Sequence, residues 1–236
     1  MKKTFLIALK EIRGFAVSPV SWVTVLAAVA VFNVFFYFLI DQNQEAALRD
    51  VFSVMEFLFI FFIPLLTMCL LAEEKSRGTL ELLLTTPTRP LAIVLGKFLG
   101  TWLFVILMLS VAWMYYFIMM FFSRPDLAET LCGWTGLVLE SGFFIAVGMM
   151  CSSWTKHQLA AALGAMFILF ALFLLPAAET YASAGLAAVI RAAGMTYHLE
   201  GFTTGLFGIS DVVYYCSGIV LSLTVARYAA EYRLWH

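Results

Sequence analysis

Long apolar segments dominate this chain and constrain its fold more than any other feature. A helix needs roughly 20 mainly apolar residues to cross the hydrocarbon core of a membrane. The composition agrees with such helices, because 63% of the residues are hydrophobic and only 12% are charged. We expect six transmembrane helices, at residues 20–40, 51–72, 94–122, 131–151, 159–175 and 212–226. The alternating pattern of membrane strands is absent, so we predict an all-α membrane protein with one transmembrane domain over residues 1–236.

The distribution of Lys and Arg predicts the orientation of these segments. If the N-terminus is cytoplasmic, 11 of the 14 basic residues fall in the inner segments and 3 in the outer ones. Cytoplasmic loops of membrane proteins carry such an excess of positive charge. We therefore expect an integral, multi-pass protein of the plasma membrane (the inner membrane in a bacterium) with both termini in the cytoplasm.

Two segments outside the spans have helical patterns of their own. Within residues 1–17, the side chains of Phe5, Leu9, Ile12 and Ala16 recur at helical spacing among basic residues. This pattern predicts a helix that lies in the membrane interface, although a basic flank without regular structure is the alternative. The outer segment at 176–211 is too long for a simple turn. We expect two short helices there, at 185–193 and 197–205, neither of which spans the membrane.

The loop at 73–90 concentrates charge between two apolar spans. Gly78 is suited to ending the second span, because glycine tolerates backbone angles that other residues avoid. Thr79 can cap a new short helix, which Pro87 would end. A helix of two turns is marginal alone, so it needs a surface to pack on. Two surfaces remain open: the bilayer itself, or a groove on a cytoplasmic protein.

Several motifs, in this order, resemble those of the ABC-2 type transporter permeases. The most specific of them is the stretch Ala72-Glu73-Glu74-Lys75-Ser76-Arg77-Gly78-Thr79-Leu80-Glu81-Leu82-Leu83-Leu84-Thr85-Thr86-Pro87. Weaker pieces lie at 62–68, 95–99, 146–148, 152–153, 158–161, 197–198, 205 and 209–215. The resemblance covers nearly the whole chain and is closest to the short six-span subgroup that includes the gliding-motility-associated permease. The chain departs from the pattern at Leu139-Glu140-Ser141, where small or apolar residues are expected.

This resemblance implies a division of labour between subunits. Two permease chains, either identical or related, would form the path through the bilayer. A cytoplasmic pair of ABC ATPases would bind and hydrolyse ATP with Mg, so this chain itself needs no cofactor. The 73–90 loop would be the coupling helix that docks on the ATPase, and residues 1–17 the connecting helix. The coupling contacts carried over are Glu74, Arg77, Gly78, Thr79, Glu81 and Leu83. The subgroup also hints at a companion subunit with a large outer domain.

Three residues inside the predicted spans are candidates for a path or a gate. Glu140 lies deep in the fourth span, where an ionisable group costs a few kcal/mol and by default faces the protein interior or a cavity. It is either a path-lining acid or a protonated or hydrogen-bonded structural residue. Glu56, near the outer end of the second span, could instead reach the interface or pair with Arg49 or Arg124. Pro64 is expected to bend the second span, as a hinge or as a static kink.

Other classes of function are disfavoured by what the sequence contains. No phosphate-binding loop of the form Gly-x-x-x-x-Gly-Lys-Ser/Thr occurs, so ATP hydrolysis is expected in a partner and not in this chain. The three histidines are dispersed, which predicts no metal site, and the net charge of −1 gives no reason to expect nucleic acid. Two alternatives to an exporter stay open. The chain could be a non-transporting scaffold or force-transmitting subunit, or an intramembrane enzyme that uses Glu140 or His198.

Overall fold

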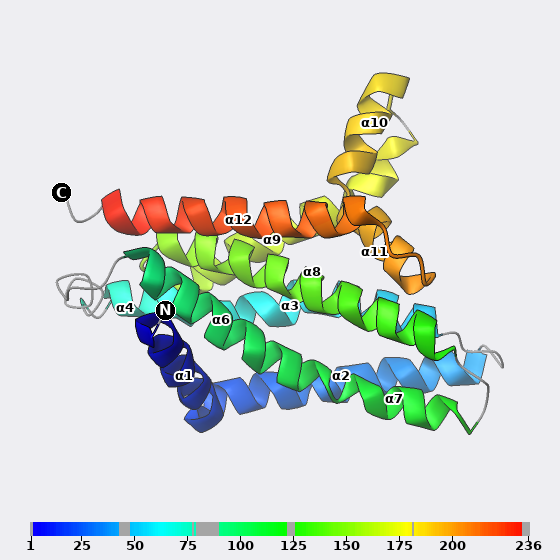
Figure 1. Ribbon diagram of the computed structural model, residues 1–236, viewed down its shortest axis with the longest axis horizontal. Helices are drawn as coiled ribbons and strands as arrows, with labels where there is room; N and C mark the ends of the chain where they lie inside the picture. Colours follow the sequence, from blue (N-terminus) through cyan, green and yellow to red (C-terminus); the bar gives the residue numbers. More distant parts are fainter. Residues whose placement is uncertain are drawn as a thin grey trace.

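The computed structural model describes residues 2–42, 48–76, 78, 90–121, 126–180 and 182–232. Every regular element in these residues is a helix (Figure 1). In chain order they are α1 (Lys2–Val17), α2 (Pro19–Gln42), α3 (Leu48–Thr67), α4 (Cys69–Ser76), α6 (Pro90–Leu109), α7 (Ala112–Met119), α8 (Leu127–Trp154), α9 (Gln158–Glu179), α10 (Ala184–Ala193), α11 (Met195–Thr203) and α12 (Ile209–Tyr232).

Six segments within the described residues are long and apolar enough to cross a membrane, which confirms the predicted all-α, six-span fold. They are Pro19–Phe38, Arg49–Ser76, Pro90–Met119, Leu127–Trp154, Gln158–Glu179 and Ile209–Ala230. Most of them run past the ends that the sequence predicts. The fifth, predicted to end at residue 175, continues through Pro176 to Glu179. Hydropathy marks the part of a helix inside the hydrocarbon, whereas the backbone hydrogen bonds continue into the polar interface.

Two of the spans are interrupted. The second span consists of α3 and α4, with a break at Met68. The third span, predicted as one helix from 94 to 122, begins already at Pro90 and divides into α6 and α7 at Ser110 and Val111. At that break the Ser110 hydroxyl donates a hydrogen bond to the carbonyl of Leu107, 2.6 Å away. A hydroxyl that competes in this way for a carbonyl of the preceding turn bends a helix.

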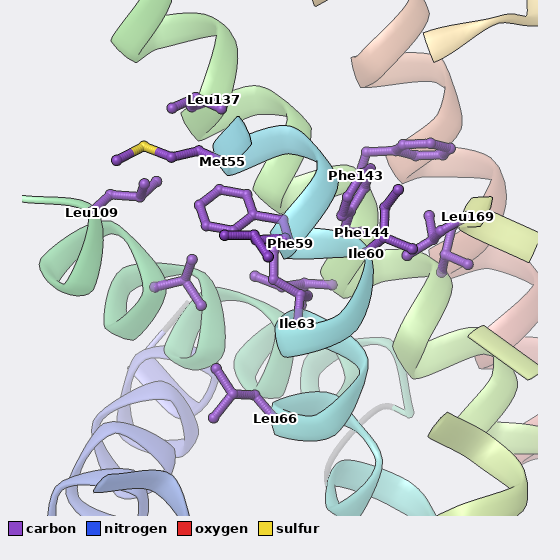
Figure 2. Packing of buried hydrophobic residues seen from close by; sticks show 14 of the residues in the cluster. Met55, Phe59, Ile60, Ile63, Leu66, Leu109, Leu137, Phe143, Phe144 and Leu169 are labelled. Carbon is purple, nitrogen blue, oxygen red and sulfur yellow. The ribbon is translucent and has the colours of Figure 1, made fainter. Parts of the chain in front are cut away.

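Helix α8 lies at the centre of the bundle. Of the apolar part of α8, 78% is buried in the protein, against 22% in each of α2, α9 and α12. Helix α3 packs beside α8 and fills the core on two sides (Figure 2). Figure 2 shows Phe59 of α3 on the side of Leu109 and Leu137, and Ile60 near Phe144 and Leu169. The three lightly buried spans therefore offer most of their surface to lipid or to other chains.

The short helices lie at the two ends of the bundle (Figure 1). Helices α1 and α4 lie at one end, which we name the α1 end, and α11 lies at the other, the α11 end. Helix α10 projects sideways from the bundle beyond α12. The predicted helices at 1–17, 185–193 and 197–205 correspond to α1, α10 and α11. The two ends therefore differ in build: a charged loop leaves the α1 end, and a pair of short helices covers part of the α11 end.

Candidate functional site

A buried lysine joins three helices at the α1 end. The Nζ atom of Lys97 in α6 lies 2.9 Å from the Glu11 carboxylate of α1 and 2.8 Å from the Glu74 carboxylate of α4. The Lys97 side chain is only 3% exposed, whereas the two glutamates are 17% and 21% exposed. A buried ammonium group needs opposite charge and hydrogen-bond acceptors to offset its lost hydration. This ion cluster of Lys97, Glu11 and Glu74 therefore ties α1, α4 and α6 to one another.

Two glycines of α6 bring α1 close enough for this contact. A Cβ added at Gly96 would lie 2.8 Å from Cβ of Ile7, and one added at Gly100 would lie 2.7 Å from the carbonyl oxygen of Ala8. Either separation is shorter than real Cβ contacts allow, so larger residues would force the helices apart. Because the glycines flank Lys97, the backbone of α1 rests directly against the turn of α6 that carries the buried cation.

The packed face of α1 is not the stripe that its sequence pattern marks. Ala8 is 4% exposed and lies against α6, whereas Phe5 and Leu6 are 68% and 63% exposed. The stripe that includes Phe5 and Leu9 therefore points away from the bundle. An amphipathic helix with an exposed apolar face is suited to the membrane interface, so α1 can contact the bundle on one side and lipid on another.

The break in the second span is completed by a side chain from the fourth. The Ser152 hydroxyl of α8 accepts hydrogen bonds from the backbone N–H groups of Leu71 and Ala72, at 3.1 and 2.9 Å. The same hydroxyl donates to the carbonyl of Met68, 3.0 Å away. Ser152 is fully buried, so water cannot serve these backbone groups in its place. Pro64, the predicted bend, lies within α3 four residues before this break.

The charged loop begins directly after this break and the ion cluster. Helix α4 ends at Ser76, and Gly78 follows with a φ of +69°, which confirms that glycine ends the second span. The Glu74 carboxylate, predicted to contact an ATPase, is turned towards Lys97. The other predicted coupling contacts lie outside the described residues, so their roles stay predictions: Arg77, Thr79, Glu81 and Leu83.

A cavity of about 790 Å³ opens beside the ion cluster. Its walls come from α1, the start of α2, the second span around its break, Lys97 of α6 and the first residue of α9. The lining residues are Lys10, Glu11, Gly14, Phe15, Ser18, Val20, Ser21, Thr24, Leu65, Leu66, Met68, Cys69, Leu70, Glu73, Glu74, Lys97 and Gln158. The α1 end thus combines an ion cluster, a helix break and an accessible cavity.

Comparison with known protein families identifies the chain. The family model described as ABC-2 family transporter protein matches residues 24–190, more than half of the sequence. The chain belongs to the ABC-2 transporter family. It is therefore an integral, multi-pass permease of the ABC transporter type. Members of this family are membrane transport components and not themselves enzymes, and the family implies partnership with an ABC ATPase. No curated protein matches the sequence.

Two carboxylates of the permease are buried within the bundle. Glu140 of α8 is 0% exposed, and none of the described residues forms a hydrogen bond with either of its carboxylate oxygens. Glu56 of α3 is 2% exposed and accepts a hydrogen bond from the Thr196 hydroxyl of α11, 3.0 Å away. Tyr215 of α12 is also fully buried, and its hydroxyl donates a hydrogen bond to the carbonyl of Met195, the residue before Thr196. The structure thus brings the two acids into one buried region between α3, α8, α11 and α12.

Of the alternatives considered for Glu56, the structure does not show a pair with Arg49. Arg49 instead forms an ion pair of 2.5 Å with Glu200 of α11, and Glu56 faces Thr196. The reason is the position of α11, which covers the end of α3 and offers a separate partner to each side chain. Arg124, the other expected partner, lies outside the described residues.

Two further polar clusters among the described residues of the permease lie near the α11 end. His198 lies 2.7 Å from Asp211 and stacks on the ring of Tyr214 at 4.1 Å. Glu179 binds Arg191 at 2.5 Å and accepts a hydrogen bond from Tyr197. The bond to this carboxylate raises the pKa of Tyr197 above its ordinary value, and the same carboxylate raises the pKa of Arg191. These pairs hold α10 and α11 against the ends of α9 and α12.

Sequence reasoning missed the structural role of two residues in this site. The sequence alone places Lys97 among the inner basic residues and in the motif at 95–99, and Ser152 in the motif at 152–153. A signal existed for each: a lysine between two glycines, and two adjacent serines near the end of an apolar span. Neither signal names its partners: Glu11 lies 86 positions from Lys97, and Ala72 lies 80 positions from Ser152.

Proposed function

We propose that this chain is the transmembrane subunit of an ATP-driven ABC-2 exporter and moves its substrate when coupled to separate ATPase subunits. In this proposal the α1 end faces the cytoplasm, and the loop after α4 docks on the ATPase. The observation that supports it most is the ion cluster, because Lys97 links α1, α4 and α6 at the point where that loop begins.

The proposed mechanism transfers force through the cluster. Movement of the ATPase pair would displace the loop, with Arg77, Gly78, Thr79, Glu81 and Leu83 as contacts. Because Glu74 lies two residues before the end of α4, a displaced α4 would pull on Lys97 and so on α1. The break at Met68 would let α4 tilt while α3 stays packed in the core.

The proposed assembly contains more than this chain. A second copy or a related permease would complete the path, and a cytoplasmic ATPase dimer would supply ATP and Mg, with no cofactor held here. A companion subunit with a large outer domain is a further proposed partner. Glu140, Glu56 and Pro64 are proposed to line or gate the path, since two are buried acids and the third precedes the break.

Capture of an ATPase tests the docking step directly. The tagged wild-type permease, purified from its own cell, should retain an ABC ATPase. Glu81→Arg should retain much less of it, because the charge at the proposed contact is reversed. Glu129→Arg, at the start of α8 on the α11 end, is the matched control and should retain the wild-type amount. Equal capture by Glu81→Arg and Glu129→Arg would show that the loop is not the docking surface.

Reconstitution then separates export from force transmission. Vesicles that contain the purified complex should move a cargo across the membrane when ATP is supplied. Hydrolysis of ATP without movement of any cargo from the cell's own lipid and envelope material would favour the force-transmitting alternative.

A further inference from the structure

The cavity beside the ion cluster is lined by charged residues in one part and by apolar residues in another, as a binding site for an amphiphile would be. We propose that it binds one zwitterionic membrane lipid, with an ammonium-bearing headgroup at the charged end and an acyl chain along α2 and α3. The lipid would come from the leaflet on the side of the α1 end. This inference needs the membrane-spanning fold but not the proposed ATPase partner, so lipid binding and ATPase coupling can fail separately.

The size of the cavity suits part of a lipid. Its volume of about 790 Å³ falls within the roughly 300–1,000 Å³ of typical small-molecule pockets. That is room for a headgroup and the first part of a chain. The rest of the chain can continue along the exposed surface of α2, where Val20 and Val23 are 57% and 65% exposed.

Polar and apolar lining residues lie at different depths. The charged residues of the second span that line the cavity are Glu73 and Glu74, near the end of α4. Leu65 and Leu66 line it about two turns deeper along the same span, roughly 12 Å at helical rise. On the facing side Phe15 and Val20 continue the apolar wall. Water would find few hydrogen-bond partners in the apolar part of the cavity, which favours a lipid acyl chain over solvent there.

The charges favour a zwitterion over an anion. The lining residues carry two lysines, Lys10 and Lys97, and three glutamates, Glu11, Glu73 and Glu74. Lys97 is already bound by Glu11 and Glu74, so the cluster has one more negative than positive charge. A lipid phosphate can approach Lys10 at the exposed rim, while a primary ammonium group can donate hydrogen bonds to carboxylate oxygens. A lipid with only an anionic headgroup would offer no hydrogen-bond donor to these carboxylates.

Substitutions at two glycines provide a variant that fills the cavity and a matched control that leaves it open. Gly14 lines the cavity, and a Cβ added there meets no atom within 4 Å. Gly185, in α10 near the other end, has equally open surroundings. Gly14→Trp therefore places a large side chain at the cavity with no clash at its Cβ atom, and Gly185→Trp makes the same change elsewhere. Thermal unfolding midpoints near that of the wild type show that both variants remain folded.

The test measures retained lipid on the intact chain. Protein reconstituted in nanodiscs of equal dioleoyl-phosphatidylethanolamine and dioleoyl-phosphatidylglycerol is released and analysed by native mass spectrometry. We expect one phosphatidylethanolamine on the wild type and on Gly185→Trp, and about tenfold less on Gly14→Trp, because the indole occupies the volume that the lipid would bury. Lys10→Glu should also lower retention, since it removes the cation opposite the phosphate.

Four results would overturn the proposal. Equal retention by Gly14→Trp and Gly185→Trp would place the lipid elsewhere, and a wild type that retains no lipid would leave the cavity to water or to another chain. Preferential retention of phosphatidylglycerol would refute the headgroup assignment. Displacement of the lipid by soluble glycerophosphoethanolamine would show that the acyl chain contributes nothing to binding.

Discussion

At the scale of residues, the α1 end depends on the charges around Lys97. An ammonium group that is 3% exposed is tolerated because two carboxylates from different helices contact it. Removal of one partner from a buried ion pair is strongly destabilising, because the remaining charge stays buried without compensation. The cluster therefore makes the position of α1 depend on that of α4, because Lys97 binds one carboxylate from each helix.

The substitution Lys97→Met tests this dependence. It leaves the Glu11 and Glu74 carboxylates facing each other without the cation, and we expect a loss of about 3 kcal/mol in unfolding free energy. Lys156→Met, at an exposed lysine between α8 and α9, is the control and should change stability by less than about 0.5 kcal/mol. Unfolding in mixed micelles measures both, and hydrogen exchange should show α1 opening first in Lys97→Met. Unchanged protection of α1 would mean that glycine packing alone holds that helix.

At the scale of elements, the second span is a broken helix held by its neighbour. The Ser152 hydroxyl accepts hydrogen bonds from two backbone N–H groups and donates one to a backbone carbonyl. This single side chain therefore replaces several backbone hydrogen bonds that a continuous helix would form. Thr67, just before the break, turns its hydroxyl back to the carbonyl of Ile63 at 3.1 Å. Gly148 of α8 makes room for Thr67, because a Cβ at this glycine would overlap the threonine side chain. The bend is thus built jointly by α3, α4 and α8.

Adjacent serines in α8 offer a sharp test of this junction. Ser152→Ala leaves the N–H groups of Leu71 and Ala72 without their buried acceptor, and we expect a loss of about 2 kcal/mol. Ser153→Ala removes a buried hydroxyl whose one hydrogen bond among the described residues is to the carbonyl of Met150 in its own helix, and it should cost about 0.5 kcal/mol or less. Thermal unfolding with hydrogen exchange over residues 68–76 measures the difference. Equal losses for the two variants would exclude a special role for Ser152.

At the scale of the whole molecule, the two ends of the bundle present different chemistry. The α1 end carries the start of the charged loop at Gly78, the ion cluster and the cavity, whereas the α11 end carries two short helices held by ion pairs. Helix α8 passes between them through the middle of the protein, contacts the break at Met68 through Ser152 and carries the buried Glu140. Movement at the α1 end can therefore reach the other end through the most buried helix.

Impermeant labelling of whole cells tests which end faces the cytoplasm. Residue Ser183 lies between α9 and α10. In a variant without the four native cysteines, the thiol introduced by Ser183→Cys should react with a membrane-impermeant maleimide. Lys156→Cys, in the turn at the α1 end, should react only after the cells are opened, because basic turns stay on the cytoplasmic side. The reverse pattern would invert the proposed orientation and place the charged loop outside the cell.

The sequence by itself determined the class of fold, the six spans, the glycine that ends the second span and the two short helices near the α11 end. These follow from local properties: apolar length, backbone preferences and helical spacing. It could not determine the partners of Lys97, the hydroxyl of Ser152 at the break, the packed face of α1 or the contact of Glu56 with Thr196. Only the tertiary structure decided these, because each joins groups on different helices and depends on how helices rotate and approach in packing. The candidate site was therefore predictable as a place in the chain, whereas its ion cluster and cavity required the fold.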